Sequence, residues 1–278
     1  MLQWWQSIIL GIVEGVTEFL PISSTGHLNV VEKLMGLSID DKGVTAYTAV
    51  IQVGAIAAAV VYFWRDIVRI ASAWFAGLRD AAKRTADYQM GWAIIAGVAV
   101  TVVVALGFKP LIEGPLRNLW VIVGSFVIWG LVMLVADRLG KQDRGEHSIT
   151  VKDGVLLGLI QSIALIPGIS RSGATISGGL LMGIDRVTAT RLSFFLGIPT
   201  LLAAGGFEAA TEAKNIAGSV GWASTGIGIV VSFVVAYASI AWLLKFVATN
   251  NFTAFVVYRI VAGLAIAGLL LSGVILPV

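Results

Sequence analysis

Two acidic side chains inside an apolar segment are the first residues of this chain that could do chemistry. Glu14 and Glu18 lie four residues apart, so on a helix both carboxylates share one face and could bind one ligand together. A charged group at membrane depth is costly and is a functional candidate by default. Paired carboxylates suit a hard divalent cation, Mg2+ or Ca2+, whereas an interhelical hydrogen-bonding pair or a proton relay is the alternative.

A run of hydroxyl groups and an imidazole follows the acids. Ser24 lies three residues before His27, which predicts a nucleophile beside a group suited to proton transfer near neutral pH. Glu18 would act with them as a catalytic carboxylate. The hydroxyls of Ser23 and Thr25 would bind phosphate or cap the following helix, and a helix start alone would also explain the whole run.

The same polar pattern occurs twice in the chain. GIVEGVTEFLPISSTGH at 11–27 and GLIQSIALIPGISRSGAT at 158–175 align at a fixed offset of 147 positions. Each copy runs an apolar helix into a break that contains Pro, Gly and hydroxyl groups. Irregular backbone at membrane depth is tolerated only where it is buried in protein or lines a wet cavity, so the repeated break indicates a site.

The second copy carries a cation where the first copy carries a hydroxyl. Arg171 aligns with Ser24, and its planar guanidinium matches phosphate oxygens in a bidentate way. An ion pair to Glu14 or Glu18 is the alternative use of this arginine, although such a pair contributes little net stability in lipid. The anion-binding groups that we expect in this copy are Ser170, Arg171, Ser172 and Thr175.

The composition places the chain in the membrane. Hydrophobic residues make up 58% of the sequence and charged residues only 13%, far from the average of soluble domains. The net charge of +3 is small and its cations are scattered, which argues against nucleic acid as a partner and leaves membrane lipids. The chain has no cysteine, so disulfides and thiolate chemistry are excluded.

Hydropathy predicts an all-α integral membrane protein with six transmembrane helices. The segments around the two breaks are too short to cross a ~30 Å hydrocarbon core, so we expect them to form two re-entrant helix-loop-helix hairpins. The flanks of these hairpins are 2–20 and 28–36 in the first copy, and 153–166 and 176–184 in the second. The six expected spans are about 45–64, 88–107, 119–136, 188–206, 221–243 and 254–274.

Each half of the chain then holds one hairpin and three spans, within a single membrane domain over 1–278. Because three is odd, the second copy starts on the opposite side of the membrane, which predicts an inverted-topology repeat. The repeats are 1–136 and 153–278, joined by a cytoplasmic loop over 137–152.

Most Lys and Arg residues are expected on the same side of the membrane as that loop. Because cytoplasmic loops carry an excess of Lys and Arg, we assign this side to the cytoplasm. We assign Lys245 and Arg259 to the same side. The segment 67–86 carries Trp and Phe among basic residues, which predicts an amphipathic helix at the membrane interface, with a surface loop as the alternative.

The strings EGVTEFLPISSTGH and PGISRSGAT, together with the six-span frame, resemble the undecaprenyl-pyrophosphate phosphatase family, also called the bacitracin-resistance family. The resemblance covers nearly the whole chain. It implies a multi-pass enzyme of the bacterial inner membrane that removes one phosphate from undecaprenyl pyrophosphate and so recycles the lipid carrier for peptidoglycan synthesis. It also implies bacitracin resistance, a divalent cation and a site that opens toward the periplasm.

Position by position, Glu14 and Glu18 resemble the acidic motif of that family. Ser24 and His27 resemble its proposed catalytic pair, and Ser170, Arg171 and Thr175 resemble its pyrophosphate-binding loop. The residues taken alone predict metal-assisted phosphoryl transfer. The competing class is a transporter or flippase of an anionic isoprenyl lipid, because broken helices in inverted repeats are also typical of carriers. A structural scaffold would leave the buried charges without a purpose, and the sequence leaves a homodimer open.

Overall fold

The computed structural model describes residues 2–37, 42–113, 116, 118–211 and 220–277. Their regular structure is helical, apart from an isolated β-bridge between Arg144 and Ile184. Six of the helices are long and apolar enough to cross a membrane, which confirms the all-α membrane class and the number of spans. These helices are α3 (Lys42–Tyr62), α5 (Ala86–Glu113), α6 (Leu119–Leu139), α9 (Arg186–Thr211), α11 (Trp222–Thr249) and α12 (Thr253–Leu271).

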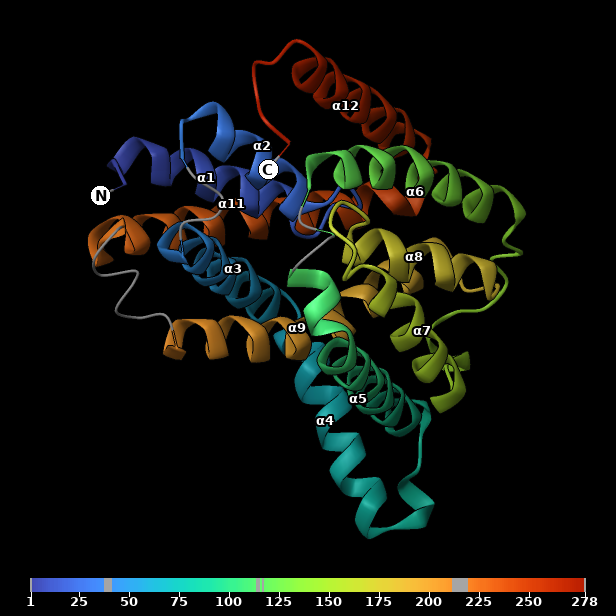
Figure 1. Ribbon diagram of the computed structural model, residues 1–278. Helices are drawn as coiled ribbons and strands as arrows, with labels where there is room; N and C mark the ends of the chain where they lie inside the picture. Colours follow the sequence, from blue (N-terminus) through green and yellow to red (C-terminus); the bar gives the residue numbers. More distant parts are fainter. Residues whose placement is uncertain (1, 38–41, 114–115, 117, 212–219, 278) are drawn as a thin grey trace.

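Two pairs of shorter helices surround the two breaks (Figure 1). The second helix of each pair has 11 residues, and its two copies begin and end at positions 147 apart. The sequence repeat is therefore also a repeat of helix boundaries. The first pair is α1 (Trp4–Thr17) and α2 (Ser24–Leu34), separated by the first break at 18–23; the second pair is α7 (Val151–Ile163) and α8 (Arg171–Leu181), separated by the second break at 164–170.

The two breaks end in the same backbone geometry. Ser23 has φ 75° and Ser170 has φ 78°, a left-handed conformation that is costly for a residue with a Cβ atom. Each serine offsets part of this cost by acting as the N-cap of the following helix. Its hydroxyl accepts a hydrogen bond from the backbone N–H three residues later, at Gly26 and Gly173 respectively. The strained serines therefore fix where α2 and α8 begin.

The short helices pack on spans that belong to the other half of the chain. α1 lies along α11, and α7 lies along α5. A Cβ atom at Gly11 would come within 2.9 Å of the Gly228 carbonyl oxygen, and one at Gly158 within 2.3 Å of the Gly97 carbonyl oxygen. Such close backbone approach between small residues is how helices associate without help from water.

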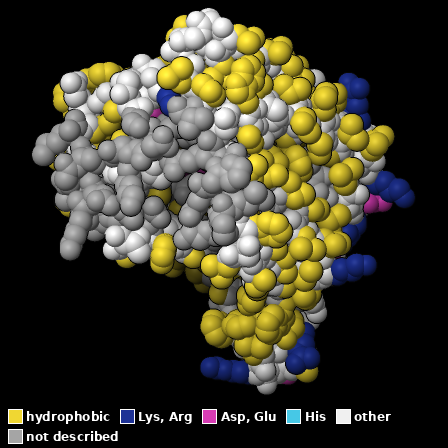
Figure 2. All heavy atoms as spheres, viewed as in Figure 1, with side chains coloured by type: hydrophobic (Ala, Val, Ile, Leu, Met, Phe, Trp, Pro, Cys, Tyr) yellow, Lys and Arg dark blue, Asp and Glu magenta, His cyan; other side chains and the backbone are white. Residues whose placement is uncertain are grey.

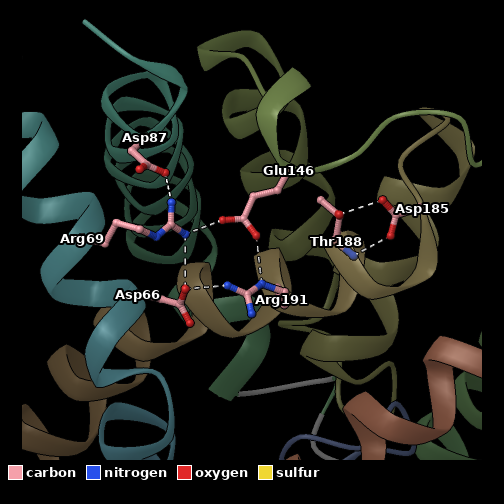
Figure 3. A network of polar contacts seen from close by, with 7 residues as sticks. All are labelled: Asp66, Arg69, Asp87, Glu146, Asp185, Thr188 and Arg191. Carbon is pink, nitrogen blue, oxygen red and sulfur yellow. Dashed lines mark hydrogen bonds and ion pairs between the residues drawn. The ribbon is translucent and has the colours of Figure 1, made fainter. Parts of the chain in front are cut away.

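Ion pairs join several helices at one end of the molecule. Arg69, on α4 (Trp64–Arg79), contacts the carboxylates of Asp66, Asp87 and Glu146, and Arg191 of α9 contacts Asp66 and Glu146 (Figure 3). This network connects α4, the start of α5, the short 3-10 helix η2 (Glu146–Ser148) and the start of α9. A network of shared carboxylates fixes geometry better than isolated surface pairs do.

Further contacts tie the neighbouring loops to the same end. Asp137, near the end of α6, accepts hydrogen bonds from Arg186 Nε at 2.7 Å and from the Phe252 backbone N–H at 2.9 Å. Figure 2 shows Lys and Arg side chains along the right edge and at the lower tip, where Figure 1 places the ends of α6 and α8 and the turn after α4. The described cations of these segments thus gather at one end.

Arg259 does not belong to that surface group, so its assignment to the cytoplasmic cations is wrong. Its side chain is fully buried on α12. The predicted amphipathic helix at 67–86 does form, as α4, followed by the short 3-10 helix η1 (Ala81–Lys83) after Asp80. One face of α4 packs on α5 through Trp74 and Trp92, whose ring centroids are 5.5 Å apart. Its place at the membrane interface stays a prediction.

We predict that Gly158→Ala lowers the stability of the protein. The added methyl group would meet the Gly97 carbonyl at 2.3 Å and push α7 away from α5, at a cost of about 1–3 kcal/mol. The measurement is the thermal unfolding midpoint in detergent. Gly124→Ala is the matched control, because a Cβ atom there meets nothing within 4 Å. Equal midpoints for the two variants would show that the α5–α7 contact tolerates the methyl group.

Candidate active site

A cavity of about 640 Å³ lies between the two breaks and the helices α5, α7 and α9. One end of its wall is polar and the other is built from apolar side chains of α5 and α9. Both breaks contribute to the polar end, so the two halves of the chain meet at one site. The predicted site residues that line the cavity are Glu18, Ser23, Ser24, Thr25, Ser170 and Arg171.

Glu18 connects the two breaks. Its Oε2 accepts a 2.5 Å hydrogen bond from the Ser24 hydroxyl, and its Oε1 lies 3.5 Å from Nη2 of Arg171. The side chain is only 4% exposed, so both contacts are made away from bulk solvent. One carboxylate oxygen accepts a hydrogen bond from the Ser24 hydroxyl, and the other faces the Arg171 guanidinium. A carboxylate placed in this way is suited to activate the hydroxyl.

Arg171 lies flat against α9. Its Nη1 donates a 2.7 Å hydrogen bond to the Ser193 carbonyl, and its buried Nε has no partner among the described residues. This placement requires glycine at position 197, where a Cβ atom would come within 1.6 Å of Nη1. The guanidinium is thus fixed in place beside Glu18 at the cavity wall, where its positive charge suits an anion.

Glu14 lies one helical turn before Glu18 and is 1% exposed. Its Oε1 is buried without a hydrogen-bond partner in the described part of the chain. A buried carboxylate oxygen of this kind needs a proton or a cation. A hard cation held by the two carboxylates is one way to meet this need, but Glu14 is not among the residues that line the cavity, and no group of three His, Cys, Asp or Glu occurs among the described residues.

His27 and Ser24 lie three residues apart on α2, but each makes its hydrogen bonds to other groups. The imidazole Nδ1 lies 2.7 Å from the Ser23 carbonyl oxygen and Nε2 lies 2.7 Å from the Tyr258 hydroxyl. The ring also stacks on Tyr258, with centroids 5.6 Å apart. Both nitrogens are thus occupied outside the cavity, and the Ser24 hydroxyl turns to Glu18 instead. No hydrogen bond joins the serine and the histidine in the described structure, so their role as a catalytic pair stays a prediction.

Two of the expected phosphate-binding hydroxyls support the loops instead of lining the cavity. Ser172 donates to the Leu20 carbonyl at 3.0 Å and so ties the second break to the first. Thr175 donates to the Arg171 carbonyl one turn earlier in α8. Both side chains are fully buried. Sequence alone does not separate a hydroxyl that faces a ligand from one that bonds to its own backbone.

Arg259 holds the two breaks together and was not predicted at the site. Its guanidinium donates to the carbonyls of Pro21 at 3.2 Å, Ser125 at 3.0 Å, Phe126 at 3.3 Å and Gly168 at 2.8 Å. An arginine inside an otherwise apolar span was the available signal, because such a charge is rarely placed there without a partner.

Gln161 was also not predicted at the site, although it is the repeat counterpart of Glu14. Its Nε2 donates to the Thr101 hydroxyl at 3.0 Å, and both residues line the cavity.

Comparison with known proteins gives one consistent result. The family model described as "Bacitracin resistance protein BacA" matches residues 7–265. The chain is 53% identical over 282 residues to an undecaprenyl-diphosphatase of Cutibacterium acnes, with 99% of both chains covered. It is 55% identical over 272 residues to undecaprenyl-diphosphatase 1 of Streptomyces coelicolor, with 97% of both covered. The chain therefore belongs to the BacA family.

Proposed function

We propose that this protein is a membrane phosphatase that hydrolyses undecaprenyl diphosphate to undecaprenyl phosphate and inorganic phosphate. The observation that carries the proposal is the contact of Glu18 with both Ser24 and Arg171 inside one cavity. The names of relatives at about half identity over nearly the full chain support the same substrate. The activity recycles the lipid carrier for peptidoglycan synthesis and accounts for bacitracin resistance.

Ser24 is the nucleophile in this proposal and Glu18 is its base. The Ser24 oxygen attacks the terminal phosphorus while its proton passes to Glu18, 2.5 Å away. The bond from this phosphorus to the bridging oxygen breaks, and undecaprenyl phosphate leaves as an anion. Water then attacks the phosphoserine, and the proton on Glu18 returns to the Ser24 oxygen as phosphate is released.

Arg171 binds the terminal phosphate. The guanidinium is held against α9 before the substrate arrives, so its positive charge is already in place as negative charge develops on the phosphate. Ser23, Thr25 and Ser170 add polar atoms around the same end of the cavity. His27 supports the Ser23 carbonyl and so acts by positioning. Ser172 and Thr175 likewise position the second break, through their hydrogen bonds to the carbonyls of Leu20 and Arg171.

Glu14 and Glu18 are the residues that would hold a divalent cation, Mg2+ or Ca2+. The unpartnered Glu14 oxygen supports this role. Such a cation, when bound, neutralises part of the diphosphate charge and stabilises the transition state for phosphoryl transfer. The protein keeps both carboxylates buried, which strengthens their interaction with any cation that enters.

The two helix pairs are re-entrant hairpins of an inverted repeat in this proposal, with repeats over 1–136 and 153–278. The matched boundaries of α2 and α8, and the matched packing of α1 on α11 and of α7 on α5, support that arrangement.

The end with the ion pairs, including the loop at 137–152, faces the cytoplasm in this proposal. The ion pairs lie at the starts of α5 and α9, whereas the cavity lies along their later turns. The site therefore opens toward the periplasm.

Glu18→Gln should lower kcat by at least ~100-fold, because an amide neither takes the Ser24 proton nor keeps the negative charge beside Arg171. The assay is phosphate release from farnesyl diphosphate in detergent with Mg2+ or Ca2+ present. Asp80→Asn is the control, since this exposed carboxylate caps η1 and pairs with Lys83 at the surface. A protein that binds the lipid as a carrier would release no phosphate at all. Glu18→Gln turnover near the wild-type rate would contradict the role of Glu18.

Gly197→Ala should impair catalysis although it adds only one methyl group, because that methyl displaces the Arg171 guanidinium from α9. We expect a loss of about 10-fold or more in kcat/KM, the effect of misplacing a charge clamp. Gly206→Ala on the same helix is the matched control, since a Cβ atom there meets nothing within 4 Å. Arg171→Lys should also stay impaired. Full activity in Gly197→Ala would show that the observed pose of Arg171 is unimportant.

Ser24→Ala should reduce the single-turnover rate by ~100-fold or more while leaving substrate affinity nearly unchanged, because the hydroxyl acts in the transition state. Acid quenching of the wild-type reaction should trap a phosphoserine at position 24. His27→Asn should lower the rate less, since it removes a support of the loop. Retention of more than about a tenth of the rate in Ser24→Ala, with no phosphoserine, would assign the attack to water.

A further inference from the structure

A second cavity, of about 290 Å³, lies against α4 and has no part in the chemistry described above. None of its residues lines the cavity that holds Glu18, Ser24 and Arg171. Its volume is at the lower end of the range of pockets that bind small molecules. The wall is built from apolar residues of three helices, with Ile67, Ile70, Ala71 and Trp74 on α4, Gly91, Ile94 and Ile95 on α5, and Phe195, Ile198 and Pro199 on α9.

α4 carries an exposed apolar stripe beside this cavity. Trp64 is 59% exposed and Phe75 is 58% exposed, whereas Ile70 and Gly77, on another side of the helix, are buried against the protein. Ala71 lines the cavity and is itself exposed, so the stripe and the cavity form one continuous apolar surface. The stripe consists of exposed residues at helical spacing on one side of α4, namely Trp64, Val68, Ala71, Phe75 and Leu78.

This apolar surface lies beside two membrane spans. α5 and α9 complete the cavity wall, and both are long and apolar enough to cross a membrane. Their cavity residues belong to the first four turns of each helix, close to the ion-pair network that we place at the cytoplasmic end. Figure 2 shows hydrophobic side chains over the region where Figure 1 places α4, with Lys and Arg beyond them at the lower tip. An apolar surface in this position suits acyl chains.

Two arginines flank the stripe without a partner in the described part of the chain. Arg65 and Arg79 are exposed, and neither makes an ion pair or a side-chain hydrogen bond with another described residue. Arg69 differs from them, because its guanidinium contacts three carboxylates. By helical spacing, Arg65 and Arg79 lie on the edge of the stripe that is away from α5. Cations along the edge of an apolar helix face are typical of helices that bind anionic membrane surfaces.

An anionic phospholipid matches both features of α4 at once. Its acyl chain suits the cavity, and its headgroup phosphate suits an exposed arginine. A zwitterionic phospholipid would fill the cavity equally well, but its own ammonium group would offset the phosphate charge. A soluble anion would use the arginines and leave the stripe and the cavity without a ligand.

We propose that α4 binds anionic phospholipids, with one acyl chain in the cavity and with headgroup phosphates at Arg65 and Arg79. The two arginines are separated by about 21 Å along the helix at ~1.5 Å per residue, so they contact different lipid molecules. This site is separate from the active site, and the inference does not rest on the proposed function.

Headgroup recognition is tested by titrating the detergent-purified protein with dioleoyl phosphatidylglycerol or dioleoyl phosphatidylcholine and counting bound lipids by native mass spectrometry. Wild type should bind phosphatidylglycerol about 10-fold more tightly. Arg65→Gln/Arg79→Gln should remove most of this preference, at about fivefold per arginine, and leave phosphatidylcholine binding within about threefold. Arg138→Gln is the matched control, because this arginine is exposed at the end of α6 and lies outside the α4 surface. Equal affinities for the two lipids in wild type would overturn the proposal, as would an equal loss in Arg138→Gln.

The position of the acyl chain is tested by photolabelling with a phosphatidylglycerol that carries a diazirine on one chain. We expect labels on 67–74, 91–95 and 195–199, and labels confined to other segments would overturn the site. Ala71→Trp fills the cavity and should lower phosphatidylglycerol affinity by about 10-fold or more, whereas Ser72→Trp, at an exposed position outside the cavity wall, should not. Equal affinities of these two variants would also contradict the site. Neither measurement uses turnover, so a failure of the proposed phosphatase activity leaves both results decisive.

Discussion

The constraint on which this structure depends is that the backbone groups left unpaired at the two helix breaks must find hydrogen-bond partners inside the protein. Each helix pair is interrupted at a buried or half-buried break inside the protein, and an unpaired carbonyl there is costly. Arg259 meets this need for both breaks at once, because it donates to the carbonyls of Pro21 and Gly168 from a fully buried position. Ser172 adds a direct bond from the second break to the Leu20 carbonyl of the first.

The same contacts explain why the polar residues of the site come together. With the breaks fixed against each other, Glu18 from one copy faces Arg171 from the other across 153 positions of sequence. Ser23 and Ser170, whose φ angles are positive, fix where α2 and α8 begin. They thereby fix the direction of the side chains of Ser24 and Arg171, the first residues of these helices. Burial raises the cost of each charge, so the ion pair, the Ser24 hydrogen bond and any phosphate or cation become strongly interdependent.

Much of the fold could be predicted from the sequence, because hydropathy and length are local properties. The span expected at about 45–64 is α3 at Lys42–Tyr62, and the other five were placed equally well. The acids, hydroxyls and Arg171 were found from their types and their repetition. The ion pair of Arg171 with Glu18 was among the alternatives predicted for that arginine. The partners of the other two groups were not predicted, since Ser24 bonds to Glu18 while His27 bonds to Tyr258, 231 positions away. Gly197 has meaning only once Arg171 lies against it.

The differences between the two copies explain how a duplicated frame can hold a single site. The first copy keeps carboxylates and a hydroxyl, while the second has Gln161 in the place of Glu14 and Arg171 in the place of Ser24. Two acidic copies would repel each other at this depth, and two cationic copies would lack a base. Opposite charges from the two copies, Glu18 and Arg171, attract across the interface, and in the proposed function they supply a proton acceptor and an anion clamp.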